Sequence, residues 1–216
     1  MTIKLVIFDF DGTLADSFPV FSESLNELAV KHGFRKVATD ECHALRGMSA
    51  TEVLRQLGLP LWRVPTVLLD FRAIMRRRIH EIRLFPGMLD ALNAMMRDQI
   101  ELAVATSNSI SNVQAVLGKS LACRMVAQEC GATLFGKSRR LSRILDSTRI
   151  DRTEAIYIGD EIRDAEAADR VGVAFGAVGW GYTELDALRR RTNPSKVFRA
   201  PADLQFAFAD RKPLCV

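Results

Sequence analysis

The feature that most constrains this chain is a pair of aspartates that directly follow a short apolar run near its start. Residues 3–8 are mostly β-branched or aromatic, which is typical of a strand buried on both faces of a parallel sheet. Asp9 and Asp11 come where this strand is expected to end, and Gly12 permits a sharp turn after them. In open α/β sheets, ligands bind beyond the carboxyl ends of the parallel strands. The sequence therefore predicts charged side chains at a ligand-binding edge.

Two carboxylates two residues apart repel each other, and a cation between them relieves that repulsion. Carboxylate oxygens are hard ligands of the kind that Mg2+ prefers. We therefore expect Asp9 and Asp11 to contribute to a divalent metal site. The alternative is an ordinary Asp-Gly turn with solvated side chains, and this stretch alone does not decide between the two.

The composition is typical of a soluble globular protein, with 48% hydrophobic and 26% charged residues among 216. No apolar run reaches the roughly 18 residues needed to cross a membrane, and the start lacks a signal-peptide pattern, so we expect a cytoplasmic protein without membrane association. The four cysteines lack the spacing of a zinc site or a disulfide framework. The net charge of +4 is spread over separate arginine clusters, so nucleic-acid binding is not expected.

Residues 16–85 are predicted to be entirely helical. Apolar residues recur at helical spacing from Asp16 to Gly33, where Ser17 is the expected cap. A capping-box pattern at 49–52 predicts a second helix that ends at Gly58, and an apolar face from about Pro65 to residue 82 predicts a longer one.

After Pro86 and Gly87 the pattern changes to alternating strands and helices. Strands are expected at 100–105, 124–126, 155–158, 173–178 and near Val197, with a helix between each successive pair of the first four and a closing helix from Pro201. Such alternation indicates right-handed βαβ units and a parallel sheet with helices on both faces. The first strand must join that sheet, so the helical residues 16–85 form an insertion in an α/β fold.

Further polar groups follow other strands of the predicted sheet. Thr106 and Ser107 follow the strand at 100–105, where hydroxyls can bond an anion or simply cap a turn. Asp160 and Asp164 follow the strand at 155–158 and share one face if a helix begins at once, so both can reach one cation. The alternative is a pair of helix-start acids favoured by the helix dipole. Lys137, in a predicted loop before a helix, is either a phosphoryl-binding cation or a solvated lysine.

These groups occur in a recognisable order along nearly the whole chain: Asp9-x-Asp11-Gly12-Thr13, the strand end at Thr106, Lys137 and Gly159-Asp160-x-x-x-Asp164. In this order they resemble the four motifs of the haloacid dehalogenase superfamily of hydrolases, especially its phosphoglycolate phosphatase-like branch with a helical cap. Phe85-Pro86-Gly87 and Val178-Gly179-Trp180-Gly181-Tyr182 resemble that branch as well. The resemblance implies a Rossmann-like catalytic core formed by residues 1–15 and 86–216, and an all-helical cap formed by residues 16–85.

The resemblance also implies a magnesium-dependent phosphatase whose ligand is a small phosphorylated metabolite, either phosphoglycolate-like or a sugar phosphate. Asp9 would be the nucleophile and form an aspartyl phosphate, and Asp11 would be the general acid and base. Mg2+ would be held by Asp9, the backbone carbonyl of Asp11, Asp160 and Asp164.

Thr106 and Lys137 would bind the phosphoryl oxygens, with Ser107 as the rival hydroxyl. In the cap, Arg46 is the candidate for contact with the substrate. We expect His80 and Arg76 to Arg78 on the cap surface, and Trp62 and Trp180 in packing roles.

Two other functions fit the same motifs. A phosphosugar mutase shares the aspartate pair and the cap, and a non-catalytic phospholigand-binding protein could use the same fold. A dehalogenase is disfavoured because that branch lacks the second aspartate, which is present here as Asp11.

Overall fold

A six-stranded parallel sheet forms the centre of the computed structural model, which describes residues 2–38, 41, 45, 48, 50–131 and 136–208. The strand order is β3-β2-β1-β4-β5-β6. The strands are β1 (Leu5–Phe8), β2 (Glu101–Thr106), β3 (Ala127–Cys130), β4 (Ala155–Gly159), β5 (Ala174–Val178) and β6 (Lys196–Phe198). Phe8 at the end of β1 pairs with Val104 of β2 and Ile158 of β4. The carboxyl ends of these three strands therefore meet at one edge of the sheet.

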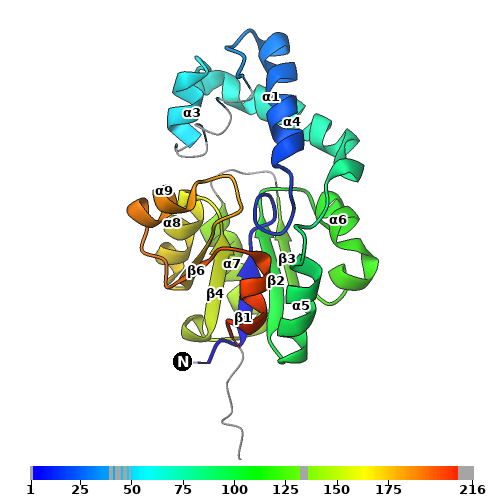
Figure 1. The fold of residues 1–216 in the computed structure, drawn as a ribbon, viewed down its shortest axis with the longest axis vertical. Coiled ribbons are helices and arrows are strands. Elements are labelled where there is room, and N and C mark those ends of the chain that lie inside the picture. The colour runs from blue at the N-terminus through cyan, green and yellow to red at the C-terminus, as the bar shows by residue number, and fades with distance from the viewer. Residues whose placement is uncertain are drawn as a thin grey trace, which may run out of the picture.

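Helices cover both faces of the sheet, as the sequence predicts (Figure 1). One face packs against α5 (Met88–Arg97), α6 (Ile110–Ala122) and the 3-10 helix η4 (Pro201–Phe206), and the other against α7 (Lys137–Thr148), α8 (Ile162–Val171) and α9 (Leu185–Arg191). Successive residues of β1 enter the two cores alternately, so that Phe8 faces the first and Ile7 the second. The expected α/β class is confirmed.

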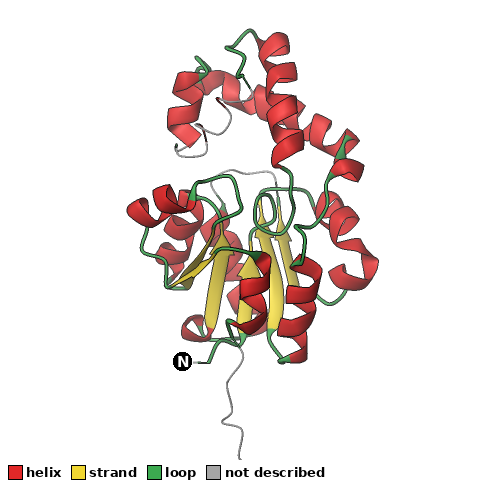
Figure 2. Cartoon of the chain, viewed as in Figure 1, coloured by secondary structure: helices red, strands yellow, loops and turns green. Residues whose placement is uncertain are grey.

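The helices between β1 and α5 lie beyond the carboxyl ends of the strands (Figure 2). They are α1 (Phe18–His32), α3 (Ala50–Gln56), η1 (Leu61–Arg63), α4 (Val64–Arg77) and η2 (Ile79–Glu81). A separate apolar cluster holds them together: Leu25, Leu28, Val37, Leu45, Leu57, Leu59, Val67 and Ile74. The two connections to the sheet lie side by side, since Ala15 and Leu84 form a bridge and the amide of Asp16 donates to the carbonyl of Arg83 at 2.8 Å.

Some local expectations differ from the structure. The strand expected at 124–126 lies at Ala127–Cys130, because the amide of Arg124 still bonds the carbonyl of Leu121 at the end of α6. The closing helix from Pro201 is a 3-10 helix. Helix α9 was not expected, because its sequence buries only Ala187 and Leu188 beside three arginines.

The ends of α1 are informative for the helical insertion. Gly33 ends the helix in the left-handed conformation at a φ of 66°, as expected. Ser17 occupies the N-cap position, but its side chain does not bond the helix amides, so the capping role was wrong. In the predicted capping box at 49–52, Ser49 lies outside the described residues.

Within the described part of the chain, no helix is both long and apolar enough to span a bilayer. Of the cysteines in that part, Cys123 and Cys130 are free thiols.

The helical insertion has an apolar cluster of its own, although Val20, Met75 and Ile82 also enter one core of the sheet. A change inside its own cluster is therefore predicted to loosen the insertion more than the sheet. Leu28 is 2% exposed in the apolar cluster of the insertion. Leu28→Ala is therefore expected to lower the free energy of local unfolding of the insertion by about 2–5 kcal/mol. Hydrogen exchange should then show faster exchange in α1 and α4 and unchanged exchange in β1. The control Leu61→Ala alters a side chain that is 69% exposed and should change stability by less than about 0.5 kcal/mol. Equal losses of protection in α1 and β1 would contradict a separate core.

Candidate active site

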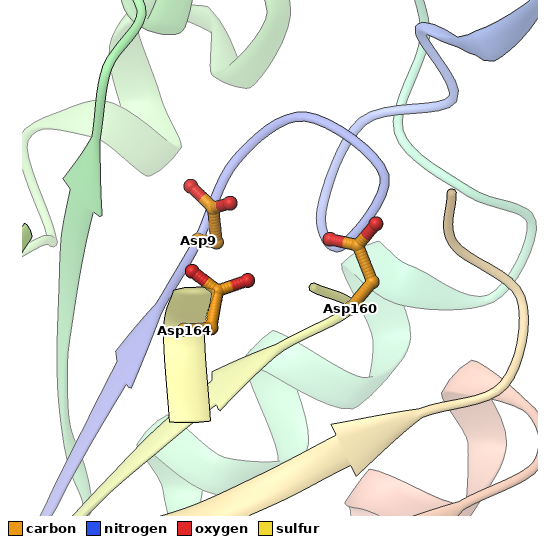
Figure 3. A group of neighbouring side chains, drawn as sticks. All are labelled: Asp9, Asp160 and Asp164. Atoms are coloured by element: carbon orange, nitrogen blue, oxygen red, sulfur yellow. The ribbon is translucent and has the colours of Figure 1, made fainter. Parts of the chain in front are cut away.

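Three aspartates meet at the carboxyl ends of β1 and β4 (Figure 3). Asp9 directly follows β1, and its amide donates to the carbonyl of Ile158 at 2.9 Å. Asp160 directly follows β4, and Asp164 lies in the first turn of α8. One carboxylate oxygen of each lies within 4.8 Å of the others, and all three side chains are buried. The structure therefore brings together the three side-chain acids for which a metal role was predicted.

Two glycines allow the chain to pass close to the Asp160 side chain. A Cβ on Gly12, whose φ is 76°, would lie 2.4 Å from an Asp160 carboxylate oxygen. A Cβ on Gly181 would lie 2.1 Å from the Asp160 Cβ. The carboxylate accepts hydrogen bonds from the Thr13 hydroxyl at 2.8 Å and from the Tyr182 amide at 2.7 Å. Asp160 is thus held by two segments that are far apart in the sequence.

Lys137 supplies a buried positive charge beside these acids. Its Nζ donates to Asp9 at 2.5 Å and also bonds Asp164, and the residue is only 4% exposed. It is the first residue of α7 and does not lie in a loop, so both the predicted location and the solvated alternative were wrong. Tyr157 lies in β4, and its hydroxyl donates to Asp164 at 3.1 Å.

Burial makes ionisation of these acids costly. It raises the pKa of Asp160 well above its usual range, and the negative charges of Glu161, Asp164 and Asp9 raise it further. Burial also raises the pKa of Asp9, against the opposing effect of Lys137. Burial alone would lower the pKa of Lys137, but Asp164 and Asp9 outweigh it and raise that pKa above its usual value.

The donor set fits a magnesium ion. Three buried carboxylates face one ammonium group, so the cluster carries an excess of negative charge that a divalent cation would neutralise. All three offer hard oxygen donors within a small space. The fit rests on the kind and spacing of these oxygen donors, since a bound cation would favour the ionised form of each acid.

Asp11 lies beside the cluster, and its side chain is not a member of it. The side-chain amide of Asn108 donates to both Asp11 carboxylate oxygens, at 2.9 and 3.2 Å. Burial raises the pKa of Asp11, and hydrogen bonds from Asn108 and Ser17 oppose that rise. Asn108 was not predicted as a site residue, although it directly follows Thr106 and Ser107. Whether the backbone carbonyl of Asp11 binds a metal ion stays a prediction.

The other predicted site residues have varied surroundings. The Thr106 hydroxyl accepts a hydrogen bond from the backbone amide of Asn108 at 3.0 Å, which is the bond of a turn cap. Ser107, just after β2, is half-buried. Arg46 lies outside the described residues. The phosphate-binding roles of Thr106, Ser107 and Lys137 remain predictions.

Of the residues expected on the cap surface, His80 is exposed, while Arg78 pairs with Glu23 and Glu81. Trp62 is 74% exposed, so its predicted packing role was wrong. Trp180 does pack, with its ring 6.2 Å from that of Phe85.

The chain is similar in sequence to a known family of hydrolases. The family model described as "Haloacid dehalogenase-like hydrolase" matches residues 6–178. The chain is 30% identical to a phosphoglycolate phosphatase of Synechococcus elongatus over 203 residues, which cover 94% of this chain and 95% of that protein. It is also 30% identical to a phosphoglycolate phosphatase of Agrobacterium fabrum, over 84% of this chain and 82% of that protein.

Solved structures share the fold. A haloacid dehalogenase-like family hydrolase from Streptococcus pneumoniae superposes with a TM-score of 0.79 at 21% identity, covering 95% of this chain and 98% of that chain. CbbY from Rhodobacter sphaeroides, solved in complex with phosphate, superposes with a TM-score of 0.74 at 21% identity, covering 96% and 99%.

The position of Lys137 predicts its effect on stability. Without added metal ions, Lys137→Met is expected to lower the free energy of unfolding by about 3–5 kcal/mol, because Asp9 and Asp164 lose a buried counter-charge. Urea unfolding in the presence of EDTA measures this. The control Arg143→Met removes a cation from the same helix whose side chain is 55% exposed, and should cost no more than about 1 kcal/mol. Equal stability of the two variants would contradict the buried ion-pair cluster.

Proposed function

The chain belongs to the haloacid dehalogenase-like hydrolase family, and on that basis we propose that it is a magnesium-dependent phosphatase of small phosphomonoesters. The observation that carries the proposal is the buried pair of Lys137 and Asp9 at the end of β1, next to Asp160 and Asp164. A nucleophile, a cation for phosphoryl oxygens and two metal-binding acids lie in one cluster. Because both relatives described above are named phosphoglycolate phosphatase, phosphoglycolate is the first substrate to test.

Asp9 is the proposed nucleophile. One of its carboxylate oxygens attacks phosphorus in line with the leaving oxygen, so that an aspartyl phosphate forms as the ester bond breaks. Water then attacks the phosphorus of this intermediate, which releases inorganic phosphate and restores the Asp9 carboxylate. The position of Asp9 at a strand end supports this role, because its backbone is hydrogen-bonded to Ile158 and its carboxylate to Lys137.

Asp11 is the proposed general acid and base. It donates a proton to the departing alcohol oxygen and later takes a proton from the attacking water. The two hydrogen bonds from Asn108 support this role, since they fix the carboxyl group beside the nucleophile.

Asp9, Asp160, Asp164 and the backbone carbonyl of Asp11 are the proposed ligands of Mg2+, which would neutralise charge between the nucleophile and the phosphoryl group. Lys137 and the hydroxyl of Thr106 or Ser107 are the proposed partners of the phosphoryl oxygens. The Lys137 ammonium supports this arrangement, because it already bonds the acid that would be phosphorylated.

We further propose that residues 16–85 form a cap domain and that residues 1–15 and 86–216 form the catalytic core. The separate apolar cluster of the insertion and its place beyond the strand ends support that division. A cap in this place would enclose the substrate and select the leaving group, and Arg46 stays the candidate for that contact. The proposed ligand is a small phosphorylated metabolite of the cytoplasm.

The nucleophile is tested with Asp9→Asn. This variant should release phosphate at least about a thousandfold more slowly than the wild type, because an amide is a poor nucleophile. Steady-state phosphate release from phosphoglycolate with Mg2+ measures the rate, and circular dichroism checks the fold. The control Asp90→Asn alters an exposed acid in the first turn of α5 and should keep full activity.

Two results would contradict the proposal. Wild-type activity in Asp9→Asn would exclude this nucleophile. Failure of the wild type to release phosphate from any member of a panel of phosphoglycolate and sugar phosphates, with Mg2+ present, would exclude the phosphatase. Conversion of one sugar phosphate isomer into another without net phosphate release would favour a mutase.

The acid role of Asp11 predicts a dependence on the leaving group. Asn108→Ala should slow hydrolysis of phosphoglycolate about 10- to 100-fold, because an alkoxide leaving group needs the proton that a well-placed Asp11 donates. Hydrolysis of p-nitrophenyl phosphate should fall much less, since its phenolate leaves without protonation. The control Asn93→Ala removes a surface amide that bonds Arg124 at 2.7 Å and should change neither rate. Equal losses on both substrates would contradict this role of Asn108.

A further inference from the structure

The segment that follows β5 contacts both Asp160, a proposed ligand of the cation, and the helical insertion. The backbone amide of Tyr182 donates to the Asp160 carboxylate at 2.7 Å. The hydroxyl of the same residue shares a 2.7 Å hydrogen bond with the Ser17 hydroxyl, at the N-cap of α1. One residue therefore joins a predicted metal ligand to the first helix of the insertion.

Aromatic contacts strengthen this connection. The Tyr182 ring lies 5.4 Å, between ring centroids, from both Phe18 and Phe21 of α1. Such pairs contribute beyond simple burial of apolar surface and hold the ring in one orientation. A displacement of α1 would therefore act on the Tyr182 side chain through its ring as well as its hydroxyl.

Trp180 anchors the same segment on its other side. Its indole N–H donates to the carbonyl of Thr13 at 2.9 Å, and the Thr13 hydroxyl donates to Asp160 at 2.8 Å. The two oxygens of Asp160 are thus bonded by groups whose positions depend on Trp180 and Tyr182. This leaves the carboxylate little freedom to move independently of the segment.

We propose that Tyr182 is a positioning residue that couples the seating of α1 to the placement of the Asp160 carboxylate. Binding of Mg2+ at the three aspartates and seating of the helical insertion then favour each other, because coupling between two sites is reciprocal. The inference rests on the proposed function only in taking Asp160 as a ligand of the cation.

The test begins with Tyr182→Phe, which keeps the ring and the backbone amide and removes only the hydroxyl. Calorimetric titration with Mg2+ alone should show a dissociation constant raised about two- to tenfold, as expected for the loss of one hydrogen bond. In the wild type, Mg2+ should also slow amide exchange in α1, and this protection should be lost in Tyr182→Phe.

A double-mutant cycle identifies the bond responsible. Ser17→Ala removes the other partner of the same hydrogen bond, together with the Ser17 bond to Asp11, so it should weaken Mg2+ binding at least as much. The double variant should bind Mg2+ more tightly than the sum of the two single losses predicts, because the shared bond is lost only once. Additive losses would contradict the coupling.

A matched control separates this role from general loosening of the insertion. Glu52 of α3 accepts hydrogen bonds from Arg191 of α9 at 3.0 and 3.4 Å, another contact between the insertion and the sheet-bearing part of the chain. Glu52→Gln weakens that contact without touching Asp160, so Mg2+ affinity and the protection of α1 should be unchanged.

Three results have distinct meanings. Wild-type Mg2+ affinity with retained protection of α1 in Tyr182→Phe would overturn the inference. An equal loss in Glu52→Gln would overturn it too, because any loosening of the insertion would then suffice. Unchanged Mg2+ binding in Asp160→Asn would instead overturn the cation site of the proposed function, whatever Tyr182 does.

Discussion

The buried ammonium group of Lys137 is the interaction on which the rest of the site depends. Asp9 and Asp164 bring carboxylates into the protein interior, where an unpaired charge is costly, and Lys137 bonds both. Because Lys137 is the first residue of α7, the packing of that helix against the sheet sets where the charge lies. Apolar residues such as Ile144, buried under the sheet, thus help to determine the spacing of the acids. The packing of α7 against the sheet therefore stabilises the core and also places the charge of Lys137 beside the acids.

Much of this architecture could be predicted because parallel strands end at a common edge. An apolar strand followed by an acid occurs twice, and Phe8 lies opposite Ile158 in the sheet, so Asp9 and Asp160 emerge near each other. Asp164 follows one helical turn later on the same side. The sequence pattern gives the strand ends and the helix period, whereas the register of β1 on β4 comes from the structure.

The remaining site residues depend on packing between distant segments. The bond from Asn108 to Asp11 and the bond between Tyr182 and Ser17 join residues that are far apart in the sequence. No local sequence pattern predicts such bonds. The burial of Lys137 was missed for the same reason, since a lysine at the start of a helix is usually solvated. Trp62 shows the converse, because a large aromatic side chain suggests burial and this one is exposed.

The paired connections at Ala15 and Leu84 have a consequence for how such a protein can diversify. The chain leaves and re-enters the sheet at nearly one point, and the insertion carries its own apolar cluster. An exchanged insertion therefore needs to reproduce the crossing point, the side chains of Val20, Met75 and Ile82 that enter one core of the sheet, and the aromatic face of α1 that meets Tyr182. The strands and their acids can stay unchanged. On the proposed cap role of residues 16–85, exchange of the whole insertion would change the substrate preference while the acids at the strand ends stay the same.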